Sequence, residues 1–517
     1  MPAKRLTGAA ALVLPLVLLF VAQSVSAVSL SVNGIGQALI YPYYTVNKAQ
    51  DTLISVTNAS DISKAVQVRF LEGYNGRDTL DFVLYLSPHD VWTAAVSQTA
   101  DDGGAILRTA DASCTFPPIP SSGMPMSSAG YDGSGVYPSD AGPTSITRTR
   151  EGSIEFLVGA DIAPGSPTDI AITHVQNNTP GGGVPPGCAT LSDTSALPDE
   201  VTPTDGIYGT GTIINVGQGT FFAYNADAIQ GFTDIPLFRP TDAIVSLEDA
   251  NSSDALNGVA RAYVPDELGA PFALDYAFAI DAVSAVFMAD TIYNEFIVAA
   301  SLGANTDWVV TFPTKNFYVD KTLYPFNPTT PFDGPFTAPG RSDVAVEGTV
   351  YDREEGAQRY DACELCPPVA PLPVLSYQVN VIGFRSAGST DPSGVLGSNL
   401  VSLSIPPLGD DGNATMNFNL STPRSLPGGL VDNFGVAVSL GGLPVTGFMV
   451  YNVINANAQP GLLANYSGAF PHRATVSCQR GAGPQTCSAT ITGASESGVM
   501  DGHARAAATR ARSVRGK

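Results

Sequence analysis

Lysine and histidine are scarce in this chain of 517 residues. After the first five residues the lysines are Lys48, Lys64, Lys315, Lys321 and Lys517, and the chain has four histidines. The 25 Lys and Arg residues stand against 47 Asp and Glu residues, which gives a net charge of −22. A surface this negative repels nucleic acid and anionic membranes, so we expect no nucleic-acid partner. Because 44% of the residues are hydrophobic, the chain can still bury a core and is no disordered polyanion.

Long hydrophobic runs are lacking beyond the N-terminus, so we expect no transmembrane helix in the mature protein. The first segment reads as a signal peptide, residues 1–27. Lys4 and Arg5 precede an apolar run, and Val25 and Ala27 place small residues before a cut after Ala27. We therefore expect export, with the protein secreted or at the cell surface, and with the periplasm as an open alternative.

Catalytic motifs are also lacking. No Gly-x-Ser-x-Gly elbow occurs, and the histidines lie singly along the chain. Cys363 and Cys366 have the spacing of a redox pair, but prolines follow at once and exclude the helix that would activate the first thiol. We predict no catalytic residue, no cofactor and no enzyme activity.

Six cysteines in an exported chain should pair, and spacing alone leaves other connectivities open. It favours three disulfides: Cys114 with Cys188, Cys363 with Cys366, and Cys478 with Cys487.

Alternating and β-branched runs dominate, while 52 glycines and 40 prolines interrupt the chain too often for long helices. We predict an all-β fold of Ig-like or jelly-roll-like β-sandwich layers with little helix and long Pro/Gly-rich insertions. The predicted strands include residues 52–58, 66–70, 80–86, 90–96, 153–158, 168–176, 209–216, 306–312, 377–384, 415–420 and 445–454; only residues 279–290 look helical. The predicted domains are a large β-rich body at 28–366 with a loop insertion near 115–187, a C-terminal β-sandwich region at 367–492, and a disordered basic tail at 493–517.

Two residue groups are candidate binding sites. Tyr41, Tyr43 and Tyr44 could stack on sugars, although such tyrosines more commonly pack a sandwich. Asp343, Asp352, Glu354 and Glu355 belong to an acidic cluster that could supply oxygen ligands to calcium, although it matches no EF-hand and solvated acidic turns are commoner.

Residues 34–44, 306–315 and 351–355 resemble segments of large exported proteobacterial proteins of unknown function, which are cell-surface or surface-layer-like. The resemblance implies a location and one interlocked body, and it carries no catalytic residues.

These observations favour an exported structural or assembly protein without catalytic activity, acting by self-association or on cell-surface components. Two alternatives stay open: an adhesion protein that binds polysaccharide or another surface ligand, and a secreted hydrolase that uses paired carboxylates.

Overall fold

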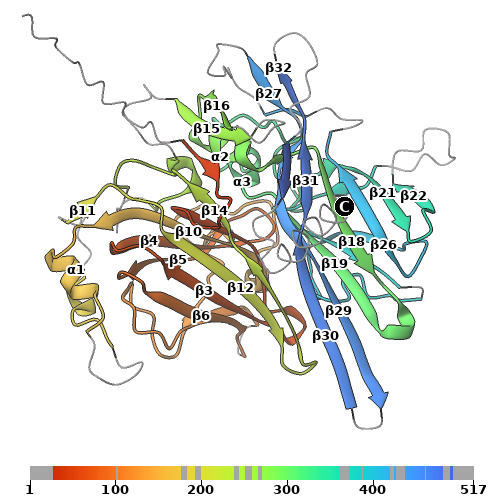
Figure 1. Cartoon of the computed structure of the whole chain (residues 1–517), viewed down its shortest axis with the longest axis horizontal. Coiled ribbons are helices and arrows are strands. Elements are labelled where there is room, and N and C mark those ends of the chain that lie inside the picture. Colours follow the sequence, from red (N-terminus) through yellow and green to blue (C-terminus); the bar gives the residue numbers. More distant parts are fainter. Residues whose placement is uncertain are drawn as a thin grey trace, which may run out of the picture.

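A computed structural model describes residues 27–100, 103–175, 183–191, 199–237, 244–250, 259–265, 271–360, 372–386, 388–419, 424–426, 437–459, 462–480 and 489–492. Strands make up 48% and helices 10%, in several sheets whose neighbouring strands are antiparallel except for one parallel pair. The predicted all-β fold is therefore confirmed, and the sheets stack as sandwich layers (Figure 1).

The N-terminal half forms a sandwich of two sheets that share a core. The first sheet has the order β1-β14-β2-β10-β4-β5-β8, with β11 also on β10. Its strands are β1 Ser29–Leu30, β2 Ala38–Thr45, β4 Lys64–Glu72, β5 Asp78–Leu86, β8 Thr115–Phe116, β10 Glu151–Ile162, β11 Glu200–Val201 and β14 Asp227–Gln230. The second sheet has the order β13-β12-β3-β6-β7-β9. Its strands are β3 Asp51–Asn58, β6 Val91–Gln98, β7 Ala105–Arg108, β9 Met124–Pro125, β12 Ile207–Asn215 and β13 Thr220–Asn225.

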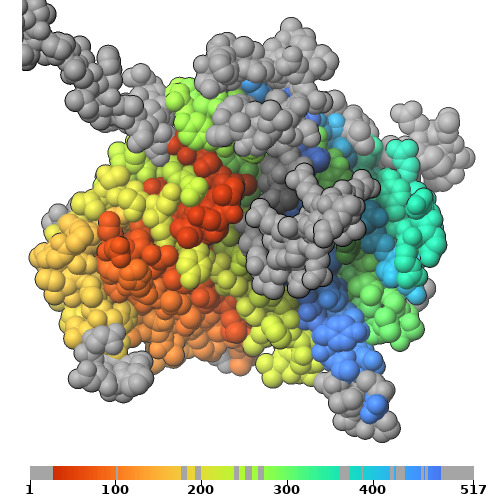
Figure 2. Space-filling view, viewed as in Figure 1, coloured from red at the N-terminus to blue at the C-terminus, as the bar shows by residue number. Residues whose placement is uncertain are grey.

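The C-terminal half forms a second pair of sheets. One has the order β22-β21-β26-β18-β31-β33 and the other β25-β24-β19-β29-β30. Their strands are β18 Thr291–Ile297, β19 Ala304–Thr311, β21 Glu347–Asp352, β22 Ala357–Tyr360, β24 Val379–Phe384, β25 Val401–Ile405, β26 Asp411–Asn417, β29 Thr446–Gln459, β30 Leu462–Pro471, β31 Arg473–Val476 and β33 Ala489–Thr492. In Figure 2 the blue β29–β30 hairpin lies beside the green β18–β19 hairpin.

Four two-stranded ribbons and several short helices complete the described fold. The ribbons pair β15 Ala260–Pro265 with β16 Pro271–Tyr276, β17 Met288–Ala289 with β28 Leu443–Pro444, β20 Val344–Ala345 with β23 Val374–Leu375, and β27 Val438–Leu440 with β32 Cys478–Arg480. The α-helices are α1 Pro167–Ile172, α2 Ala279–Phe287 and α3 Lys315–Val319, and the 3-10 turns are η1 Asn47–Ala49, η2 Ile146–Arg150, η3 Cys188–Thr190, η4 Leu247–Asp249 and η6 Ala300–Leu302.

The sheet that contains β19 is buried on both faces and joins the two halves. Trp308 on β19 packs in the C-terminal core, whereas its neighbour Val309 packs in the N-terminal core. On β29, Met449 likewise packs in the C-terminal core and its neighbour Phe448 in the N-terminal core. Since successive side chains of a strand point to opposite faces, one sheet serves both cores.

Strands from both sides of the boundary predicted at residue 367 belong to the same sheets: β24 follows it and pairs with β19, which precedes it. Residues 361–371 themselves lie outside the described residues. The stretch 115–187, expected as a loop insertion, contributes β10, which lies between β2 and β4 in the middle of its sheet.

Residues 168–176 do not form the predicted strand. Pro167 begins α1, and the Ser166 hydroxyl accepts a hydrogen bond from the backbone N–H of Asp169. A side-chain cap with proline in the first turn is a strong helix start, and here it outweighs the β-branched content of the segment.

One predicted disulfide, Cys114–Cys188, is present. Cys478 is also disulfide-bonded, but Cys363, Cys366 and Cys487 lie outside the described residues, so the other two pairings stay predictions. Within the described residues, no helix has the length and hydrophobicity needed to cross a bilayer.

Of the helix predicted at residues 279–290, Ala279–Phe287 form α2, whereas Met288–Ala289 form the strand β17. The helix carries a buried carboxyl group. Asp281 is 2% exposed, and its Oδ1 accepts a hydrogen bond of 2.6 Å from the Tyr318 hydroxyl. Burial raises the pKa of Asp281 to about 6, although the bond from Tyr318 opposes the shift. The folded protein therefore holds a proton at pH values where the unfolded chain has lost it.

Asp281→Asn is expected to change how stability depends on pH. Because the folded-state pKa is raised, this carboxyl contributes stability that is complete below about pH 4 and is lost as the pH rises through 6. The variant keeps an oxygen for Tyr318 and no longer ionises. It should match the wild type near pH 4 and exceed its free energy of unfolding by about 3 kcal/mol at most above pH 6. Urea denaturation from pH 4 to pH 8 measures this, and a difference that does not vary with pH would contradict it.

Candidate functional site

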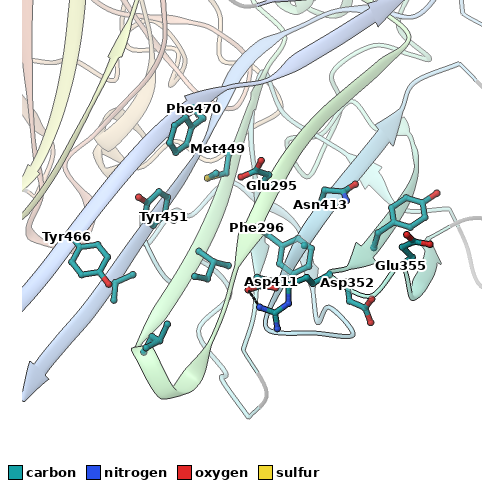
Figure 3. Close-up of a pocket in the computed structure, with 16 residues that line it drawn as sticks. Glu295, Phe296, Asp352, Glu355, Asp411, Asn413, Met449, Tyr451, Tyr466 and Phe470 are labelled. Atoms are coloured by element: carbon teal, nitrogen blue, oxygen red, sulfur yellow. Dashed lines mark hydrogen bonds and ion pairs between the residues drawn. The ribbon is translucent and has the colours of Figure 1, made fainter. Parts of the chain in front are cut away.

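A cleft of about 1000 Å³ opens between the β29–β30 hairpin and the strands β18, β26 and β21 (Figure 3). Its position follows from the lengths of the strands. β31 covers only the start of β18, Thr291–Tyr293, whereas β29 and β30 extend much further as a pair. The rest of β18 therefore faces the projecting hairpin across an open space.

Aromatic side chains form the wall contributed by the hairpin. Tyr451 on β29 and Phe470 on β30 line the cleft, and their rings stack with centroids 6.2 Å apart and planes 5° apart. Tyr466 lies on the same face of β30 as Phe470, four residues away. Tyr466 is 54% exposed and Phe470 is 50% exposed, so both rings offer free surface to a ligand.

A glycine sets the position of the Tyr451 ring. Gly468 is the cross-strand partner of Tyr451, and a Cβ added at Gly468 would lie 2.8 Å from Cε1 of that ring. The ring therefore lies over the backbone of β30, in the gap between Tyr466 and Phe470 that the missing side chain leaves.

Polar side chains form the opposite wall. Glu295 on β18, Asn413 on β26 and Tyr351 on β21 are cross-strand partners in one row, and all three line the cleft. Partners in a row share a face of the sheet, so a carboxylate, an amide and a phenol lie side by side there. Together they can both donate and accept hydrogen bonds.

The turn after β21 brings further charge to the cleft. Oδ1 of Asp352 accepts hydrogen bonds from the backbone N–H groups of Glu354 at 3.0 Å and Gly356 at 2.7 Å. This fixes the turn that carries Arg353, whose Nη1 lies 3.3 Å from Oδ2 of Asp411. With Glu295 and Glu355, the cleft is lined by four carboxylates and one guanidinium.

The three tyrosines predicted as a binding platform lie inside the N-terminal core. Tyr41, Tyr43 and Tyr44 are each 0% exposed. Their hydroxyls donate to the Ser55 carbonyl, the Glu151 carboxylate and the Thr149 carbonyl, and burial raises the pKa of all three. They present no ring face to solvent.

The four acidic residues predicted as calcium ligands do not form one group. Asp352 and Glu355 line the cleft, Glu354 in the same turn pairs with Arg353 at 3.4 Å, and Asp343 pairs with Arg341 at 3.0 Å. In the part of the chain that the structure describes, no group of three or more His, Cys, Asp or Glu side chains could hold a metal ion.

Most cleft residues were not predicted from the sequence. The only local sign is on β30, where Tyr466, Gly468 and Phe470 alternate with smaller residues. Glu295, Asn413 and Asp411 give no such sign, because the row they belong to exists only once distant strands pair. No family model, curated protein or solved structure matches the chain.

Proposed function

We propose that this protein is an exported, non-catalytic binding protein that holds a polysaccharide in the cleft between β18, β26 and the β29–β30 hairpin. The proposal rests above all on Tyr466 and Phe470, which keep about half of their surface exposed beside carboxylate and amide groups. Aromatic faces pack against the apolar C–H face of a sugar ring, and carboxylates and amides bond its hydroxyls.

The charge of the cleft selects among glycans. Four carboxylates against one arginine give it a negative potential, which disfavours uronic-acid and sulfated chains and suits neutral or amino-sugar polymers. The volume of about 1000 Å³ accommodates a segment of several sugar units. The predicted signal peptide supports an extracellular location, and the Cys114–Cys188 disulfide fits an oxidising compartment.

Self-assembly by strand addition needs free sheet edges, and two of the edges in this structure are not free. β30 and β13 are edge strands of different sheets, but they lie against each other. Asn465 Nδ2 donates to the Gln218 carbonyl at 2.6 Å, and the Ser467 hydroxyl donates to the Phe221 carbonyl at 2.5 Å. These edges are thus partly occupied within one molecule.

The binding proposal predicts large losses of affinity from two ring deletions. Each stacking ring contributes about 1 kcal/mol beyond its buried area, and the loss of that buried area adds to this, so Tyr466→Ala and Phe470→Ala should each weaken binding about tenfold. Gly468→Ala should act like them, because its methyl group displaces the Tyr451 ring. Phe326→Ala is the matched control, since Phe326 is 93% exposed and lies outside the cleft.

Affinity electrophoresis in gels that contain neutral, amino-sugar or uronic-acid polysaccharides measures these effects. We expect retardation by a neutral or amino-sugar polymer, reduced in the three cleft variants and unchanged in Phe326→Ala. Binding that survives the combined Tyr466→Ala/Phe470→Ala change would refute the proposed site. Release of new reducing ends by the wild type would refute the non-catalytic role and favour a carboxylate-dependent hydrolase.

A further inference from the structure

A lysine and an aspartate form an ion pair that is wholly shielded from water in the N-terminal sandwich. Lys64 on β4 and Asp161 on β10 are cross-strand partners, and both side chains are 0% exposed. Nζ of Lys64 lies 2.7 Å from Oδ1 of Asp161. Lysine is almost never fully buried, and a buried ion pair is a weak source of stability. Stability alone therefore does not explain why this pair is buried.

Thr204 holds both groups in place. Nζ of Lys64 also donates to the Thr204 carbonyl at 2.9 Å and to its hydroxyl oxygen at 3.1 Å. The same hydroxyl donates to Oδ2 of Asp161 at 2.5 Å. The amine is thus in contact with one carboxyl oxygen while the Thr204 hydroxyl fixes the other, so the carboxyl carbon that the amine would attack is bonded directly to the oxygen that it touches. Reacting atoms held in this way resemble a near-attack conformer.

A second carboxyl group interacts with the pair. Asp205 acts electrostatically on both Lys64 and Asp161, and partial burial of its carboxyl raises the pKa of Asp205. Burial also lowers the pKa of Lys64, against the opposing effect of Asp161 and Asp205. Unlike the buried pair, residue Asp205 is exposed at the surface, so it can exchange protons with solvent.

We propose that Lys64 and Asp161 condense without any enzyme to an amide, which cross-links β4 to β10 covalently. The amine is the nucleophile, Asp161 is the electrophile, and the Thr204 hydroxyl, which contacts both groups, carries the proton between them. This inference is independent of the cleft and of its ligand.

The reaction balances without an added reagent. A proton moves from the Lys64 ammonium to the Asp161 carboxylate, which gives a neutral amine and a carboxylic acid. The Nζ lone pair forms the new C–N bond at the Asp161 carboxyl carbon. The Thr204 hydroxyl accepts the remaining surplus proton from nitrogen and passes a proton to the departing hydroxyl, which leaves as water. An ion pair thus becomes one neutral amide and one water molecule, with no change in oxidation state.

The amide would complement the disulfide. Lys64 and Asp161 are 97 residues apart in the chain, and Cys114 lies between them while Cys188 lies beyond. The two covalent loops therefore overlap, and only the disulfide can be opened by a reducing agent.

Mass spectrometry of the reduced, full-length folded protein tests the inference. Sequencing of the two termini gives the calculated mass of the uncondensed chain. We expect a measured mass that is lower by one water molecule. Digestion should then release a branched peptide that joins Lys64 to Asp161. Lys64→Arg and Asp161→Ala should have their full calculated masses. Asp161→Asn should condense with loss of ammonia and reach the same mass as the wild-type product. Lys315→Arg is the matched control: Lys315 is also buried, but it donates only to the carbonyls of Ser342 and Tyr377, so the control should still lose water.

Two results would overturn the inference: a wild-type protein at its full calculated mass, or a water loss that persists in Lys64→Arg. The wild-type measurement needs no variant to fold. Thr204→Val should accumulate the uncondensed chain, and condensation at the wild-type rate would refute the role of the Thr204 hydroxyl as proton carrier.

Discussion

Replacing Arg148 with methionine is expected to lower the free energy of unfolding by about 3–5 kcal/mol, because it leaves two carboxylates buried without their cation. Arg148 is 4% exposed. Its Nε and Nη2 donate to the two oxygens of Glu72 at 2.6 and 2.8 Å, and its Nη1 and Nη2 donate to the two oxygens of Asp140 at 2.9 and 2.6 Å. The guanidinium also lies 4.3 Å from the centre of the Tyr131 ring.

The loss should spread to the turn that follows β4. Glu72 accepts backbone hydrogen bonds from Tyr74, Asn75 and Arg77, so its carboxylate organises the β4–β5 connection. Without Arg148 the carboxylate keeps these donors but loses its counter-charge, and a buried charge in that state is costly.

Guanidinium chloride denaturation followed by tryptophan fluorescence measures the effect. Arg353→Met is the matched control: the Arg353 side chain is 70% exposed, and exposed ion pairs contribute about 0–1 kcal/mol. Equal midpoints for Arg148→Met and Arg353→Met would show that the buried network contributes no more than a surface pair.

Removal of the Cys114–Cys188 disulfide is expected to cost about 4 kcal/mol, because the bond closes a long loop in the unfolded chain. The two cysteines are 74 residues apart. Cys114 is 1% exposed and packs with Tyr85 and Ile172 against the outer face of the first sheet. The bond thereby attaches α1 and the chain that follows it to β5 and β8.

The double variant Cys114→Ala/Cys188→Ala tests this by thermal and chemical denaturation, with the other cysteines left in place. Its midpoint should fall well below that of the wild type. Under reducing conditions the two proteins should differ much less, since the wild type then loses the same cross-link. A persistent difference there would mean that packing of the sulfur atoms, not loop closure, is the main contribution.

The sequence predicted local structure well where the pattern alone decides it. Residues 80–86 alternate in hydrophobicity, and β5 forms there because alternate side chains enter the N-terminal core. The strand predicted at residues 168–176 was wrong because the capping interaction of Ser166 is a single side-chain contact that hydrophobic spacing does not reveal. Within the helix predicted at residues 279–290, Ala279–Phe287 are helical despite three β-branched side chains, because the surrounding core buries α2, whereas Met288–Ala289 form the strand β17.

The candidate site could not be predicted, since it depends on pairing between distant strands. Tyr351, Asn413 and Glu295 come together only through the registers of β21, β26 and β18. The tyrosines at 41, 43 and 44 stood out because they are close in sequence, yet closeness in sequence does not decide whether a ring faces solvent or a core.

The sheet that serves both cores has a consequence for how the chain is made. β29 begins at Thr446, and its Phe448 stacks on Tyr224 of the N-terminal half at 4.7 Å. The first half therefore has an uncovered apolar layer until nearly the whole polypeptide has been synthesised. A nascent chain in that state is prone to aggregate, so the gene cannot be divided at the boundary predicted at residue 367 into two independently folding products.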